Sequence, residues 1–103
     1  MSPPRLGEIW WAESEDARRP VLVVTRSEAI AVMTTIVVAP VTRTVRRIPT
    51  ELRLGAEEGL AVGCAASFDN LQRIRRSSLT ERVGDLGWRG DEMCTALRAL
   101  ADC

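Results

Sequence analysis

The chain has 103 residues, of which 46% are hydrophobic and 27% charged, a composition that excludes intrinsic disorder and predicts one globular domain, residues 1–103. Fourteen acidic residues balance fourteen cationic ones, and every cation is an arginine, because lysine is absent, as are histidine and tyrosine. These absences exclude a histidine base, a Schiff-base lysine, a serine–histidine pair and a histidine-bound metal, so catalysis would rest on Arg, Asp, Glu, Ser, Thr or Cys.

Nothing in the sequence predicts export or membrane insertion. The first eight residues contain no apolar run. The most apolar stretch, 29–41, is interrupted by two threonines and Pro40, so it is too short and too polar to span a bilayer. We therefore expect a soluble, cytoplasmic protein. Its three cysteines include no CxxC pair, so we expect reduced thiols that serve as small apolar side chains, at Cys64, Cys94 and Cys103.

Seven short segments, β-branched, aromatic or alternating between polar and apolar residues and separated by turn signals, are predicted strands: 7–12, 20–25, 36–42, 50–54, 63–68, 71–74 and 82–86. The third is apolar nearly throughout and is predicted to be central, with Pro40 marking a bulge or an exposed edge. A helical turn is predicted at 78–81. A closing helix is predicted at 91–101, with Asp91 as its N-cap and an apolar face made by Met93, Ala96, Leu97 and Leu100. Several strands followed by one helix predict a mainly β fold of the small-barrel kind.

Three aromatic side chains have alternative interpretations. Trp10 and Trp11 point to opposite faces of one strand, so one is expected in the core and the other at a surface or a dimer contact, for which Trp11 is the candidate. Phe68 is a core residue or a stacking face for a base.

The zero net charge hides two clusters of arginine, 43–53 and 73–76. The guanidinium group matches phosphate and stacks on bases, so clusters that meet on one face would form a groove for single-stranded nucleic acid. The alternative is that both clusters are solvated loops.

Seven short motifs follow one another along the chain: GEIW (7–10), RPVLVV (19–24), VAPVT (38–42), IPTEL (48–52), DNLQRI (69–74), RVG (82–84) and ALRAL (96–100). Their order resembles the MazF/PemK family of toxin endoribonucleases. The resemblance runs collinearly from residue 6 to residue 101. It implies an SH3-like barrel, a homodimer, cleavage of single-stranded RNA at short sequence motifs without the ribosome, and neutralisation by a cognate MazE-like antitoxin.

Two catalytic positions carry over from the resemblance. The arginine before the proline of the second strand matches Arg19, and the threonine at the end of the third strand matches Thr42. In RNA cleavage the 2′-hydroxyl attacks phosphorus, and negative charge builds on the phosphoryl oxygens. A guanidinium can bind that charge through two hydrogen bonds and a threonine hydroxyl can donate another, so no metal or cofactor is expected. The alternatives are a salt bridge from Arg19 to an acid of the first loop, and a strand-forming role for Thr42.

The remaining site residues concern the general base and the RNA contacts. The general base is left open among Glu13, Glu15 and Asp16. Asn70 matches a position that often contacts a base, although it could be a turn residue. RNA binding is expected at Asn70 and at five arginines, Arg43, Arg46, Arg47, Arg73 and Arg75.

Two other classes compete with the ribonuclease. A CcdB-like toxin shares the fold but poisons DNA gyrase by protein contact, through a tryptophan close to its C-terminus. Here the last tryptophan, Trp88, precedes the helix. A plain SH3-like binding module would need neither Arg19 nor Thr42.

Overall fold

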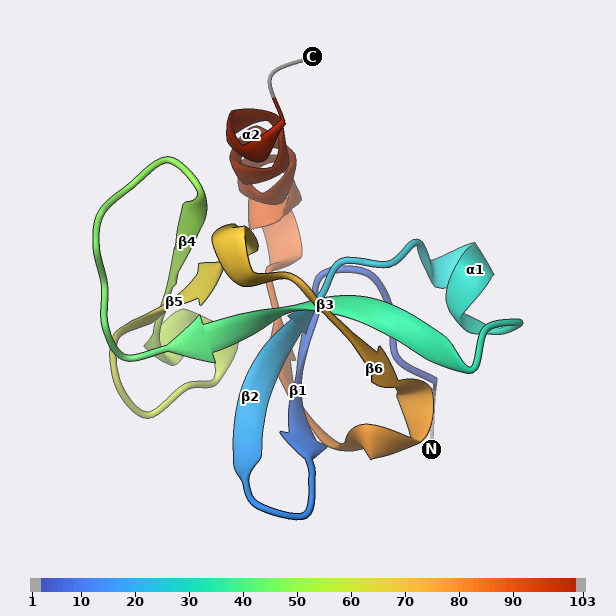
Figure 1. Cartoon of the computed structure of the whole chain (residues 1–103). Coiled ribbons are helices and arrows are strands. Elements are labelled where there is room, and N and C mark those ends of the chain that lie inside the picture. Colours follow the sequence, from blue (N-terminus) through green and yellow to red (C-terminus); the bar gives the residue numbers. More distant parts are fainter. Residues whose placement is uncertain (1–2, 102–103) are drawn as a thin grey trace.

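The computed structural model describes residues 3–101, which form seven strands, two α-helices and four short 3-10 helices (Figure 1). In chain order the elements are β1 (Glu8–Glu13), β2 (Arg18–Val23), α1 (Ser27–Ile30), β3 (Thr35–Thr42), β4 (Glu51–Leu54), η1 (Ala56–Glu58), β5 (Cys64–Ser67), η2 (Phe68–Asn70), β6 (Gln72–Arg75), η3 (Arg76–Ser78), β7 (Leu79–Asp85), η4 (Gly87–Arg89) and α2 (Gly90–Leu100).

The strands form one antiparallel sheet in the order β4-β5-β3-β2-β1-β7, and β6 pairs with the first half of β3. The sheet curls into an open half-barrel, with the C-terminal helix α2 beside it (Figure 1). The predicted mainly β, barrel-like fold with a closing helix is therefore confirmed.

The three strands at the middle of the sheet are buried on both faces. Ile9, Leu22 and Ala39 belong to one apolar cluster, together with residues of α2. Their neighbours along the chain, such as Trp10 and Val21, belong to a second cluster with α1 on the opposite face. This double burial explains why β2 and β3 read as nearly continuous apolar runs.

Pro40 lies where β3 changes partner. On one side it is opposite Val21 of β2. On the other side, β3 pairs with β6 up to Val38 and with β5 from Val41 onward. Because a proline cannot donate to a ladder hydrogen bond, this interruption is a position that tolerates it.

The helical turn η1 is held tightly against β7. A Cβ atom on Gly84 would lie 2.1 Å from the carbonyl oxygen of Glu58, so only glycine permits this approach. Gly59, which follows the turn, adopts a φ of +91°, and a Cβ atom there would lie 2.6 Å from the carbonyl oxygen of Val83. This packing fixes the start of the loop that leads from η1 to β5.

A buried ion pair links η1 to the start of α2. The carboxylate of Glu58, only 4% exposed, lies 3.0 Å from Nη1 of Arg89. Arg89 also donates to the carbonyl oxygen of Arg53 in β4 and pairs with Glu92 in the first turn of α2. One guanidinium therefore joins the turn, the edge strand and the helix.

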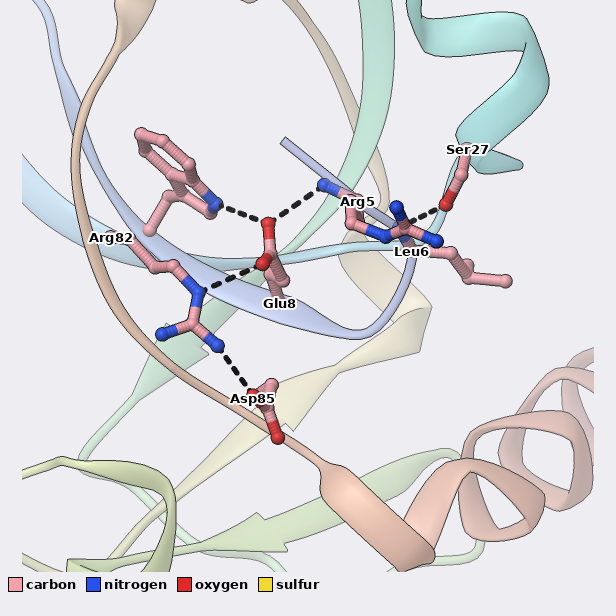
Figure 2. Close-up of polar contacts among 7 residues, drawn as sticks. Arg5, Leu6, Glu8, Ser27, Arg82 and Asp85 are labelled. Carbon is pink, nitrogen blue, oxygen red and sulfur yellow. Dashed lines mark hydrogen bonds and ion pairs between the residues drawn. The ribbon is translucent and has the colours of Figure 1, made fainter. Parts of the chain in front are cut away.

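A second polar network closes the N-terminal end of β1 (Figure 2). Oε1 of Glu8 accepts hydrogen bonds from the backbone N–H of Arg5 at 2.8 Å and from the indole of Trp10 at 3.0 Å. Oε2 accepts from Nε of Arg82 at 2.8 Å, and Arg82 in turn pairs with Asp85. Burial raises the pKa of the Glu8 carboxyl, but the bonds from Trp10, Arg82 and Arg5 outweigh it and hold the pKa below its ordinary value.

We expect Glu8→Gln to destabilise the protein at pH 7 by about 1–2 kcal/mol, because the charged acceptor is lost. A carboxyl whose pKa is depressed by folding stabilises the protein above its unfolded pKa, and this contribution disappears as the pH falls through the folded pKa. The difference between the variant and the wild type, measured by urea unfolding, should therefore shrink as the pH is lowered below 4.5. A difference that does not change with pH would contradict this account.

The structure corrects several predicted elements. The short helix α1 was not predicted. The helical turn expected at 78–81 is wrong: the turn lies at η3, and Leu79 and Glu81 pair with β1. The closing helix is confirmed, but it begins at Gly90, so Asp91 lies in its first turn and is not its N-cap. Leu100 is 42% exposed and does not extend the apolar face. No helix within residues 3–101 is long and apolar enough to cross a membrane.

Candidate active site

A groove of about 870 Å³ opens where the C-terminal end of β3 meets the β1–β2 hairpin and the loops before β4 and β5. Five of the predicted site residues line it, namely Arg19, Thr42, Arg43, Arg46 and Asn70. Polar residues that were not predicted also line it, among them Arg18, Thr44, Glu51, Ser67 and Gln72.

Arg19 lies near the start of β2, opposite Ala12 of β1, and its side chain is exposed. Within residues 3–101 no hydrogen bond or ion pair holds its guanidinium. The loop acid Glu13 instead lies 4.0 Å from Arg18, which also pairs with Glu81 and stacks on the ring of Trp11. The salt bridge considered as the alternative role for Arg19 is thus absent among the described residues. The guanidinium group of Arg19 is available to bind an anion.

Thr42 is the last residue of β3, opposite Ala65 of β5, and is half-buried. Its Oγ1 accepts a hydrogen bond from the backbone N–H of Thr44 at 3.1 Å. Because the oxygen is held by this bond, the hydroxyl proton is left to donate into the groove.

The loop from 43 to 50 carries three arginines of the first cluster, Arg43, Arg46 and Arg47, and projects away from the sheet beyond β3 (Figure 1). Oε1 of Glu51 accepts the backbone N–H groups of Arg46 at 2.8 Å and Arg47 at 3.1 Å. Arg47 has a φ of 57°, a left-handed conformation that turns the chain within this loop. Glu51 therefore anchors the loop beside Thr42.

Asn70 ends the helical turn η2 and is exposed. Its Nδ2 donates to Oγ of Ser67 at 2.9 Å, which fixes the side chain at the groove. The amide oxygen faces no donor within the described residues and is available to accept from a nucleobase.

The other predicted site residues do not reach this groove. Glu13, Glu15 and Asp16 lie in or beside the exposed hairpin turn, and none of them lines the groove. Arg47 is exposed on the loop, and Arg73 is exposed on β6. Arg75 lines a different cavity, of about 670 Å³, with Trp10 at its wall.

The aromatic side chains considered for the site differ in their burial. Trp10 is buried and Trp11 is partly exposed, as expected, whereas Phe68 is fully buried and cannot stack on a base.

Cys64 is buried and borders the groove, and its burial raises the pKa of the thiol, which argues against a nucleophilic thiolate. Cys94 is exposed, so its prediction as an apolar filler is wrong. The prediction for Cys103 lies outside the described residues.

Comparison with known proteins identifies the chain. The family model described as "PemK-like, MazF-like toxin of type II toxin-antitoxin system" matches residues 5–102. The chain belongs to this family. A curated relative from Mycobacterium tuberculosis, "Probable endoribonuclease MazF2", is 37% identical over 101 residues, which cover 96% of this chain and 99% of the relative.

Solved structures of related proteins have the same fold as this chain. The Mycobacterium tuberculosis toxin MazF-mt6 superposes with a TM-score of 0.85 at 33% identity, over 92% of this chain and 96% of that one. A mycobacterial endoribonuclease solved with its cognate antitoxin shares the fold, with a TM-score of 0.81 at 23% identity over 93% and 92% of the two chains.

These matches confirm the prediction of an endoribonuclease toxin of a toxin–antitoxin system. They do not favour the gyrase-poisoning alternative.

Proposed function

We propose that this MazF-like toxin cleaves single-stranded RNA in the groove that Arg19 and Thr42 share. The observation that carries the proposal is the pair itself: a guanidinium with no protein partner among residues 3–101 and a strand-end hydroxyl whose oxygen is already fixed. Both are donors, and the reaction needs donors where charge builds on phosphorus.

In the proposed reaction the 2′-hydroxyl of one nucleotide attacks the adjacent phosphorus. The bond from the 2′-oxygen to phosphorus forms and the bond to the 5′-oxygen breaks, which leaves a 2′,3′-cyclic phosphate and a free 5′-hydroxyl. Arg19 binds the phosphoryl oxygens through two parallel N–H groups, and Thr42 donates a third hydrogen bond. Since these donors supply the charge stabilisation, the proposed reaction requires no metal ion.

The same groove offers contacts along a single strand. Arg43 and Arg46 line it and would hold phosphates on either side of the cut, and Asn70 would read a base edge. Arg47 and Arg73 are exposed outside it and would extend the path of the strand, whereas Arg75 would contact only a long substrate. Bases must be unpaired to enter such a groove, so sequence-specific cleavage without the ribosome would be restricted to single strands.

We further propose that the toxin is a cytoplasmic homodimer and that a cognate MazE-like antitoxin neutralises it. An acidic, partly disordered antitoxin segment that folds over the arginines of the groove would block RNA by charge and by volume. The antitoxin complex of the mycobacterial endoribonuclease supports this type of partner.

The test is a digestion with purified toxin free of antitoxin. A long single-stranded RNA in EDTA should be cut at discrete sites, and the same RNA annealed to its complement should stay intact. If the single-stranded RNA stays intact while circular dichroism shows that the toxin is folded, the proposal is refuted. Cleavage that requires an added divalent metal would refute the arginine–threonine mechanism.

A further inference from the structure

We propose that Glu51 is the general base of this toxin and takes the proton from the attacking 2′-hydroxyl. The assignment rests on the RNA cleavage proposed above and adds a catalytic residue to it. No carboxylate other than that of Glu51 lines the groove within residues 3–101. The three loop acids that the sequence offers for this role do not line it.

The register of the sheet puts Glu51 on the same face as the two donors. Thr42 is opposite Ala65 of β5, and Glu51 is opposite Ser67 of the same strand. Directly opposite residues share a face, and so do residues two apart along a strand, so Thr42 and Glu51 share one face of the sheet. Val21 of β2 is opposite Pro40. Arg19 and Thr42, two residues beyond each of these, therefore lie on that face too.

One oxygen of the Glu51 carboxylate accepts hydrogen bonds from the loop, and the other is available to the substrate. Oε1 accepts the two amides of the loop, at 2.8 and 3.1 Å, which sets the orientation of the group. Within the described residues Oε2 has no hydrogen-bond partner, so one oxygen holds the loop and the other can accept a proton. A fixed acceptor in contact with the reacting hydroxyl is what general base catalysis requires.

The proton balance is simple. Oε2 of Glu51 takes the proton from the 2′-hydroxyl as the oxygen–phosphorus bond forms. The departing 5′-oxygen takes a proton from solvent water, and Glu51 returns its own proton to solvent after the products leave. No oxidant, reductant or co-reactant is needed.

Glu51→Gln separates this role from a positioning role, because the amide oxygen of glutamine can still accept both loop amides but cannot serve as a base at neutral pH. The single-turnover rate of Glu51→Gln should fall by about two to four orders of magnitude. Its affinity for an RNA with a 2′-deoxy nucleotide at the cut site should change by less than about threefold. Glu51→Ala should lose both rate and loop order. The matched controls Glu13→Gln, Glu15→Gln and Asp16→Asn should cleave at the wild-type rate.

Two results would overturn the assignment. A Glu51→Gln protein that cleaves within about threefold of wild type, beside an inactive Glu51→Ala, would make Glu51 a positioning residue only. A wild-type rate that does not fall as the pH is lowered through the range where carboxylates gain a proton would exclude a carboxylate base, even if the variants fail to fold. If the wild type leaves RNA intact, the proposed function fails as well, whereas an active wild type with either result above removes this assignment alone.

Discussion

Arg19→Ala should reduce the single-turnover rate of RNA cleavage by about two to three orders of magnitude, because one preorganised charged donor to the phosphoryl oxygens is lost. The fold should not change. The side chain is exposed and takes part in no ion pair or hydrogen bond within residues 3–101, so the melting temperature should stay within a few degrees of wild type.

Two further variants serve as controls for Arg19→Ala. Arg19→Lys keeps the charge but loses the planar fork, and it should recover only part of the rate. Arg98→Ala removes an exposed arginine of α2 that does not line the groove, and it should cleave like the wild type. An Arg19→Ala protein within about threefold of the wild-type rate would remove Arg19 from the catalytic machinery.

Thr42→Val should have the second largest effect, a loss of about a hundredfold in rate, because valine matches threonine in shape but has no hydroxyl. The change also removes the acceptor for the backbone N–H of Thr44 and should cost about 1 kcal/mol of stability. The loss should appear in the rate at saturating RNA rather than in the affinity, since the hydroxyl acts on charge that develops during the reaction.

Thr42→Ser keeps the hydroxyl and should retain most of the activity. Thr80→Val, on an exposed part of β7 outside the groove, is the control for replacing a strand threonine. If Thr42→Val weakened only RNA binding and left the saturated rate unchanged, the hydroxyl would contact the substrate without stabilising the transition state.

The fold could be predicted from the sequence where a strand is buried and its residues are therefore apolar. β2 and β3 are apolar on both faces because each face packs against its own cluster, and such runs are visible without a structure. The helix α1 has only four residues, too few for a helical period to show. The error at 78–81 has a tertiary cause: pairing of Leu79 and Glu81 with β1 decides that segment, not its local turn signals.

The candidate site was predictable only in part. Arg19 and Thr42 came from the resemblance to MazF/PemK toxins and do share a groove. Glu51 belongs to the IPTEL motif, but the sequence did not mark it as a groove residue, because its place on the same face as Thr42 depends on how β5 pairs with both β3 and β4. Arg75 was grouped with the site by charge, yet it pairs with Thr35 at the opposite end of β3 from Thr42, about 20 Å away along the strand. Charge clusters in a sequence do not reveal the end of a strand at which they lie.

The chemical ends of the cleaved RNA test the central claim most directly. The toxin is incubated in EDTA with a single-stranded RNA, and the product termini are identified by mass spectrometry and by labelling with polynucleotide kinase. Attack by the 2′-hydroxyl, assisted by Arg19 and Thr42, predicts 2′,3′-cyclic phosphates on one side of each cut and 5′-hydroxyls on the other. Products with 5′-phosphates and 3′-hydroxyls would show that water attacked phosphorus instead, and would contradict the account.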